Sequence, residues 1–235
     1  MTRFADGVAV GGRRPAGNPK QRRSSLVYLD YVPPTLDRDG VCASQTTAGA
    51  GDLLLNGALV SGGRAVLGTG VGFFGRCVGV YSAADLSAIT FTFYGYTVDG
   101  DPQIEAITGP DGDPTPATTA GLKAFGSIVR VAASAAVASA VEIGTIDKFG
   151  LPAALSDKSQ IARCGWADTL AENAATFALA DTTSPATATT GDPRGTVIQA
   201  SSAANGSRRL TVVMVPDLTS NATFYGVKTY GAGLF

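Results

Sequence analysis

The chain has 235 residues, of which 45% are hydrophobic and only 16% are charged, and it contains 30 glycines. This composition excludes an intrinsically disordered protein, and the length suffices for one large all-β domain or two small ones without stabilising disulfides. There is no histidine. Its absence excludes Ser-His-Asp and Cys-His catalysis, histidine-ligated metals and an imidazole general base.

The positive charge is concentrated at the beginning of the chain. Residues 1–23 carry six basic groups and one acidic group, a net charge of +5, whereas the other 212 residues carry 12 basic and 18 acidic groups, a net charge of −6. Glycine and proline interrupt this segment, and we expect residues 1–25 to form an extended arm. Its candidate contact residues are Arg3, Arg13, Arg14, Lys20, Arg22 and Arg23.

The arm has three possible roles. The first is a solvated tail with no partner. The second is contact with an acidic protein surface, such as that of a second copy, and the third is binding of nucleic acid through its phosphates. No aromatic side chain lies between the basic residues of 13–23. Because stacking aromatics are typical of nucleic-acid grooves, protein contact is favoured over nucleic acid.

After the arm, short apolar segments alternate with turns. Residues 26–32 and 41–45 predict strands, and Asn56-Gly57 predicts a two-residue hairpin turn between residues 51–57 and a returning strand at 58–60. A second turn at 61–63 and a strand at 64–67 follow.

The run from Gly70 to Gly75 matches the glycine pattern of dinucleotide-binding loops. That motif requires a helix opening at its last glycine, but residues 76–82 have the composition of a strand. The glycines therefore indicate bends or bulges rather than a phosphate site.

The clearest pattern lies in the middle of the chain. Ile89, Phe91 and Phe93 alternate with threonines, residues 103–108 alternate again, and turn residues 98–102 separate the two segments. We expect a strand over 88–98 that forms an antiparallel hairpin with 103–108.

The second half continues in short strands. We expect a loop at 109–116, a strand with a glycine bend at 121–131 and a strand at 141–146, while the alanine- and serine-rich residues 132–140 suit either a helix or an extended connection. Residues 181–193 predict a loop.

Trp166, the only tryptophan, is expected at the edge of the core. Asn205-Gly206 predicts a second hairpin, between residues 195–200 and 208–215, whose last strand is apolar on both faces and therefore central in a sheet.

About a dozen short strands without a convincing helix predict an all-β fold, a β-sandwich or barrel-like domain of many short antiparallel strands with an extended N-terminal arm. The predicted division is the arm, 1–25, and an all-β body, 26–235, with a possible boundary between two subdomains near residue 85.

Two further groups have a structural interpretation. Cys42, Cys77 and Cys164 are odd in number and widely spaced, which indicates three buried small hydrophobes in a reducing compartment rather than disulfides or a metal site. The aspartate pairs at 99 and 101 and at 111 and 113 each lie in an Asp-Gly-Asp-Pro sequence, where aspartate stabilises a turn.

Residues 88–110, 141–152, 183–196 and 205–217 resemble stretches of virion structural proteins of tailed bacteriophages. In size and composition such proteins resemble capsid decoration or cement proteins. The resemblance extends from about residue 46 to the C-terminus, without the basic arm, and it departs from the usual pattern at 68–79. It implies a symmetric oligomer whose partner is a particle surface.

We therefore expect a non-enzymatic decoration protein, without cofactor or metal, that stabilises contacts between major capsid subunits as a homo-oligomer, with a trimer favoured. Its expected location is the capsid surface of a virion, after synthesis in the bacterial cytoplasm, and no segment suggests a membrane span. Two alternatives are a tail or fibre-base component and a module that binds host polysaccharide. The second would use Phe73, Phe74, Tyr94 and Tyr96, although such aromatics more often belong to a core.

Overall fold

The structure is a computed structural model that describes residues 26–70, 72–112, 117–166, 175–199 and 203–215. The predicted all-β class is confirmed: these residues form short strands and a single 3₁₀ turn, Lys158–Gln160. The strands are β1 (Val27–Tyr31), β2 (Cys42–Thr47), β3 (Gly51–Asp52), β4 (Val60–Ser61), β5 (Arg64–Val66), β6 (Arg76–Ser82), β7 (Thr90–Tyr96), β8 (Pro102–Thr108), β9 (Ala117–Ala120), β10 (Ser127–Ala133), β11 (Val137–Gly150), β12 (Ile161–Trp166), β13 (Thr176–Ala178), β14 (Thr196–Ile198) and β15 (Leu210–Met214).

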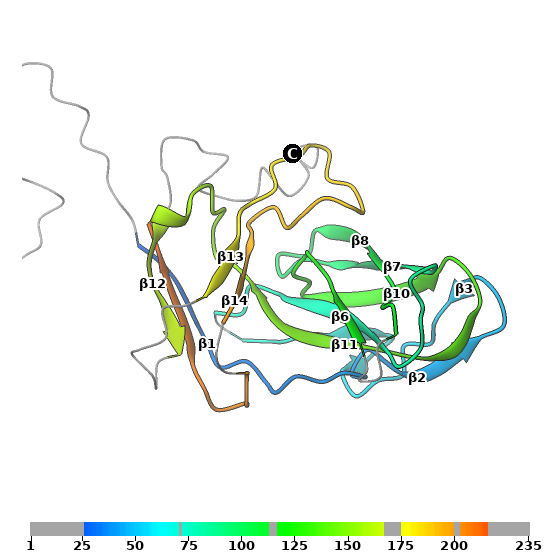
Figure 1. Cartoon of the computed structure of the whole chain (residues 1–235). Helices are drawn as coiled ribbons and strands as arrows, with labels where there is room; N and C mark the ends of the chain where they lie inside the picture. The colour runs from blue at the N-terminus through cyan, green and yellow to red at the C-terminus, as the bar shows by residue number, and fades with distance from the viewer. Residues whose placement is uncertain (1–25, 71, 113–116, 167–174, 200–202, 216–235) are drawn as a thin grey trace, which may run out of the picture.

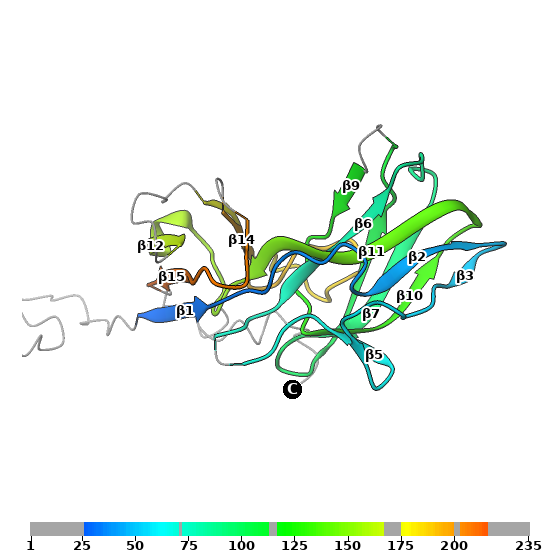
Figure 2. The ribbon, with the colours of Figure 1, turned by 90° about the horizontal axis from the view of Figure 1, so that it is seen from below.

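The strands form three sheets. One six-stranded sheet has the order β4-β5-β10-β7-β8, with β3 paired to β10, and the other has the order β13-β14-β11-β6-β9, with β2 paired to β11. The third has three strands in the order β1-β15-β12. In Figure 1 the layer of β7, β8 and β10 lies above β6 and β11, and Figure 2 shows the small sheet at one end of the molecule.

The main hydrophobic core is shared by all three sheets. Phe91 and Phe93 on β7 enter it from one large sheet, and Val80 and Ile143 enter it from the other. Because a sheet with one apolar face must cover that face, the two large sheets form a sandwich. The small sheet adds Leu29, Trp166, Leu210, Val212 and Met214 to the same core.

The hairpin predicted in the middle of the chain is confirmed as β7 and β8. Phe91 and Phe93 are fully buried, while the intervening threonines are half-buried, as the period of two requires. Tyr94 lies opposite Ile104 across the hairpin. At the turn, the Thr97 hydroxyl accepts hydrogen bonds from the N–H groups of Asp99 and Asp101, both at 3.2 Å.

The hairpin predicted at Asn56-Gly57 is wrong, since β3 pairs with β10 and not with β4. The turn predicted at residues 61–63 is confirmed, because Gly62 and Gly63 join β4 and β5 in a hairpin. Both of these glycines have positive φ, as such turns require. Asn56 has another role, because its side-chain oxygen accepts a hydrogen bond from Ala43 N–H at 2.8 Å. At Gly57 a Cβ would lie only 2.2 Å from the backbone of Gly40, so this glycine permits close packing rather than a turn.

The hairpin predicted at Asn205-Gly206 is also wrong. The strand before it, β14, pairs with β11 and β13, whereas the strand after it, β15, pairs with β1 and β12. The dipeptide therefore lies in a connection between two different sheets. The central position predicted for the last strand is confirmed by β15.

Other differences concern length and burial. The alanine- and serine-rich segment forms the end of β10 and the start of β11 rather than a helix, and β11 continues through 14 residues to Gly150. Strands β9, β12 and β13 were not predicted. Trp166 is 1% exposed, and hence lies inside the core rather than at its edge, because it belongs to β12 and packs in the core that the small sheet shares with the two large sheets. Strand pairing crosses the possible subdomain boundary near residue 85, because β5 pairs with β10 and β6 pairs with β11.

Candidate functional site

A cleft of the described surface lies where three neighbouring strands end. Ser127 on β10 has Val66 of β5 as its register partner on one side and Tyr96 of β7 on the other. Beyond this row the chain leaves β5 and β7 in different directions. The space between the two exits is a cleft of about 610 Å³, which we call the strand-end cleft. Its lining comprises Arg64, Val66, Gly68, Thr69, Gly70, Phe73, Tyr96, Thr97, Val98, Gly100, Gly126 and Ser127.

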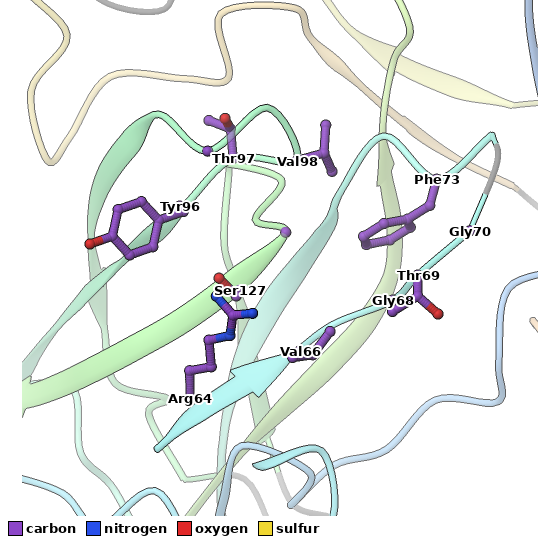
Figure 3. A pocket seen from close by; sticks show the side chains of 12 residues that line it. Arg64, Val66, Gly68, Thr69, Gly70, Phe73, Tyr96, Thr97, Val98 and Ser127 are labelled. Atoms are coloured by element: carbon purple, nitrogen blue, oxygen red, sulfur yellow. The ribbon is translucent and has the colours of Figure 1, made fainter. Parts of the chain in front are cut away.

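Two separate segments form the walls of the strand-end cleft. One wall is Tyr96 with Thr97 and Val98, and the other is Phe73 with residues 68–70, while Arg64 rises between them from β5 (Figure 3). Phe73 is held by the Tyr31 ring at a centroid distance of 5.3 Å. A Cβ at Gly68 would lie 2.6 Å from the Phe73 ring, so glycine is needed for the ring to lie against this backbone.

Several polar groups of the cleft have no partner among the residues that the structure describes. Within the described ranges, Arg64 forms no ion pair, and the hydroxyls of Tyr96 and Ser127 form no hydrogen bond. Tyr96 is 39% exposed. A guanidinium and two hydroxyls are therefore free to bind a ligand beside the apolar edges of Phe73 and Val98.

The aromatic groove considered from the sequence is only partly brought together. Phe73 and Tyr96 line the same cleft, but Phe74 lies under the guanidinium of Arg194 at 5.9 Å and Tyr94 lies under that of Arg130 at 4.7 Å. Sequence reasoning missed Arg64, because nothing in the local pattern indicates that β5 ends beside β10 and β7.

A second exposed feature is the outward side of the β7–β8 hairpin, which we call the outer hairpin face. It contains no charged residue on either strand; its members are Thr90, Thr92, Tyr94, Tyr96, Pro102, Ile104, Ala106 and Thr108. Ile104 is 43% exposed, and Val129 of the neighbouring β10 is 37% exposed. At its border Arg130 covers Tyr94 and pairs with Asp52 at 2.8 Å.

The inward side of β8 carries a buried carboxylate that sequence reasoning did not single out. Glu105 is 2% exposed, and its Oε1 accepts hydrogen bonds from the N–H groups of Leu122 and Lys123. Its Oε2 has no hydrogen-bond partner in the described part of the chain. Burial raises the pKa of Glu105 to about 7, although the two N–H groups and the ammonium groups of Lys123 and Lys148 act in the opposite direction.

The two lysines beside Glu105 are bound to backbone carbonyls. The Lys123 ammonium donates to the carbonyls of Ile104 at 2.8 Å and Thr187 at 2.5 Å, and that of Lys148 donates to Gly121 at 2.9 Å. These contacts attach the loop containing Thr187 to the edge of β8, where Ala106 N–H also donates to Ala188 at 2.8 Å. The cluster of Glu105, Lys123 and Lys148 is therefore buried, and it connects β8 to the loop containing Thr187.

The remaining sequence candidates have structural roles. The segment after Gly75 is β6 rather than a helix, in agreement with the rejection of a dinucleotide loop. The first aspartate pair lies in a turn as predicted, although the Thr97 side chain supplies the bonds to its backbone. Among the described residues no group of three acidic or cysteine side chains could hold a metal ion. Asp113 lies outside them.

All three cysteines are free and buried, in agreement with their interpretation as small hydrophobes. Burial raises the pKa of Cys42 to about 12 and that of Cys164 to about 11, so both thiols are protonated at neutral pH. The predicted contact residues of the arm, Arg3, Arg13, Arg14, Lys20, Arg22 and Arg23, lie outside the described residues.

Comparison of the chain with protein-family models, curated proteins and solved structures returned no match. Within the described ranges, no helix has the length and apolar character needed to cross a membrane.

Proposed function

We propose that this chain is a non-enzymatic structural protein of a tailed-bacteriophage virion that decorates the capsid and stabilises contacts between major capsid subunits. The observation that carries the proposal is the outer hairpin face. Two adjacent strands of seven residues each expose tyrosine, isoleucine, proline and threonine but no charge. Such a surface suits the centre of a protein interface, where charged residues are depleted and tyrosine is enriched.

The arm and the outer hairpin face have different roles in this proposal. The face makes a specific contact with the capsid protein, and the arm, with its net charge of +5 in residues 1–23, adds contacts to acidic surfaces of neighbouring subunits. A symmetric oligomer, with a trimer favoured, repeats both contacts. Repetition converts individually weak contacts into strong attachment, because each further contact forms at high effective concentration.

The proposal is tested first by gold labelling of intact virions of the encoding phage with an antibody to this chain, counted by electron microscopy. Labels distributed over the head support a decoration protein. Labels confined to one vertex would replace it with the tail or fibre-base alternative, and the absence of the chain from purified virions would refute both.

The role of the outer hairpin face is tested with a matched pair of variants. Ile104→Glu places a charge in the face, whereas Ile198→Glu places the same charge on β14 at an isoleucine of similar exposure, 43% against 38%. In co-sedimentation with heads that lack the chain, we expect Ile104→Glu to abolish binding and Ile198→Glu to retain it. Equal binding by the two variants would exclude this face.

The contribution of the arm is tested separately by deleting residues 1–23. We expect the truncated chain to fold normally, as judged by circular dichroism, and to lose binding to the heads. Retained binding would remove the arm from the proposal while leaving the outer hairpin face in it.

A further inference from the structure

We infer that the strand-end cleft is a binding site for an acidic saccharide, a sugar chain whose units carry carboxylates. The cleft volume of about 610 Å³ lies within the range of small-molecule sites. The inference goes beyond the proposed function and does not depend on it, since it concerns the binding of a soluble ligand by the free chain.

Arg64 supplies the charge recognition. Its guanidinium stands between the walls of the cleft (Figure 3), and it forms no ion pair with any residue that the structure describes. The arginines at positions 38, 76, 130, 194 and 209 each pair with a carboxylate. A guanidinium in a cleft that has no ion-pair partner among the described residues can donate two parallel hydrogen bonds to a ligand carboxylate.

The remaining lining suits the two kinds of surface on a sugar ring. A pyranose presents C–H groups on its faces and hydroxyls around its rim. The edges of Phe73 and Val98 offer apolar contact to the C–H groups, and the hydroxyls of Tyr96 and Ser127, unbonded within the described residues, can each donate and accept hydrogen bonds at the rim.

The position of the cleft favours a saccharide over an acidic peptide. An extended peptide usually binds by adding a strand to a free sheet edge. Here the strands that form the floor, β5, β10 and β7, are already neighbours in one sheet, so the cleft lies across the strand ends and offers no free edge. A ligand that needs no backbone ladder fits this site better.

The experiment uses the full chain on an array of acidic and neutral glycans, followed by calorimetry. The calorimetric probes are trigalacturonate, its neutral methyl ester, and the tightest acidic glycan of the array. We expect the acidic forms to bind and the methyl ester to bind at least tenfold more weakly. A failure of every acidic glycan to bind at millimolar concentration would overturn the inference.

Three variants locate the site. Arg64→Gln should weaken binding of the acidic probe at least tenfold, because it removes the charge-assisted pair, and Tyr96→Phe should weaken it about threefold by removing one hydroxyl. Arg163→Gln is the matched control, an exposed arginine on β12 outside the cleft, and should leave affinity unchanged. Equal loss for Arg64→Gln and Arg163→Gln would show nonspecific charge attraction and overturn the site.

A peptide competitor separates the two ligand classes. A hexaglutamate peptide carries carboxylates without sugar rings, and it should displace the acidic glycan only at concentrations at least tenfold higher. Displacement at equal concentration would overturn the saccharide assignment and indicate a peptide site. None of these outcomes depends on capsid binding, so this inference and the proposed function can fail separately.

Discussion

Replacement of Glu105 by glutamine should make the protein less sensitive to alkaline pH. The folded state raises the pKa of this carboxyl from its ordinary value of 4.5 to about 7, chiefly through burial. A group that binds its proton more tightly in the folded state contributes stability below pH 4.5 and loses that contribution as the pH rises through 7. At 1.36 kcal/mol per pKa unit, the loss is about 3 kcal/mol.

The variant removes this dependence. Glutamine retains an oxygen that can accept from Leu122 and Lys123 N–H, but it cannot ionise. The free energy of unfolding of Glu105→Gln, relative to the parent, should therefore increase by about 3 kcal/mol between pH 4.5 and pH 8. For a chain of this size the corresponding relative gain in Tm is roughly 6 to 12 °C.

Urea denaturation at pH 4.5, 6, 7 and 8, followed by circular dichroism, measures this difference directly. Glu142→Gln is the control, because Glu142 lies in a partly exposed pair with Arg38 at 3.6 Å, and such pairs contribute little to stability. Its free energy of unfolding should differ little from that of the parent. A constant difference for Glu105→Gln would refute the reasoning, since the buried carboxyl would then not titrate near neutrality.

Three further outcomes are expected. Phe93→Ala should lower the free energy of unfolding by about 3 to 5 kcal/mol in the same urea assay, because it leaves a cavity at a fully buried position of β7. The thiols of Cys42, Cys77 and Cys164 should react with Ellman's reagent only at the rate of unfolding, since all are buried; rapid reaction of the native protein would contradict this. Sedimentation equilibrium should give the molar mass of a trimer of this chain, and the mass of a monomer at all concentrations would contradict the expected trimer.

The sequence predicts strands more successfully than their partners. The alternation of Phe91 and Phe93 with threonine specifies a half-buried strand, and the turn residues after it specify a neighbour that is close in sequence. For these reasons the β7–β8 hairpin was correctly predicted. The pattern also fixes the all-β class, because period-two segments separated by glycine and proline do not suit helices.

The two hairpin predictions from Asn-Gly dipeptides were wrong because asparagine and glycine can also form hydrogen bonds and close contacts with distant segments. Asn56 bonds to Ala43, and Gly57 permits contact with Gly40, although a two-residue hairpin turn is the usual interpretation. Local preference cannot identify such roles, which depend on a segment distant in sequence or on a second sheet.

The candidate surfaces were the least predictable features. Alternation along β8 does not say which side faces inward. In the structure Glu105 and Ile107 lie on the buried side, and Ile104 lies on the exposed side. The strand-end cleft depends on β5, β10 and β7 ending together, and the pairings that align Val66, Ser127 and Tyr96 join residues about 30 to 60 positions apart. Only the tertiary arrangement places Arg64 beside them.

The pairing of β1 with β15 bears on how the chain is made. Val27 lies opposite Met214, so the first described strand completes its sheet with the last. During synthesis β1 leaves the ribosome early, yet its partner follows only after almost the whole body has been translated. Leu29 therefore waits without its core neighbours from β15, Leu210 and Val212, which favours late, post-translational closure of the small sheet.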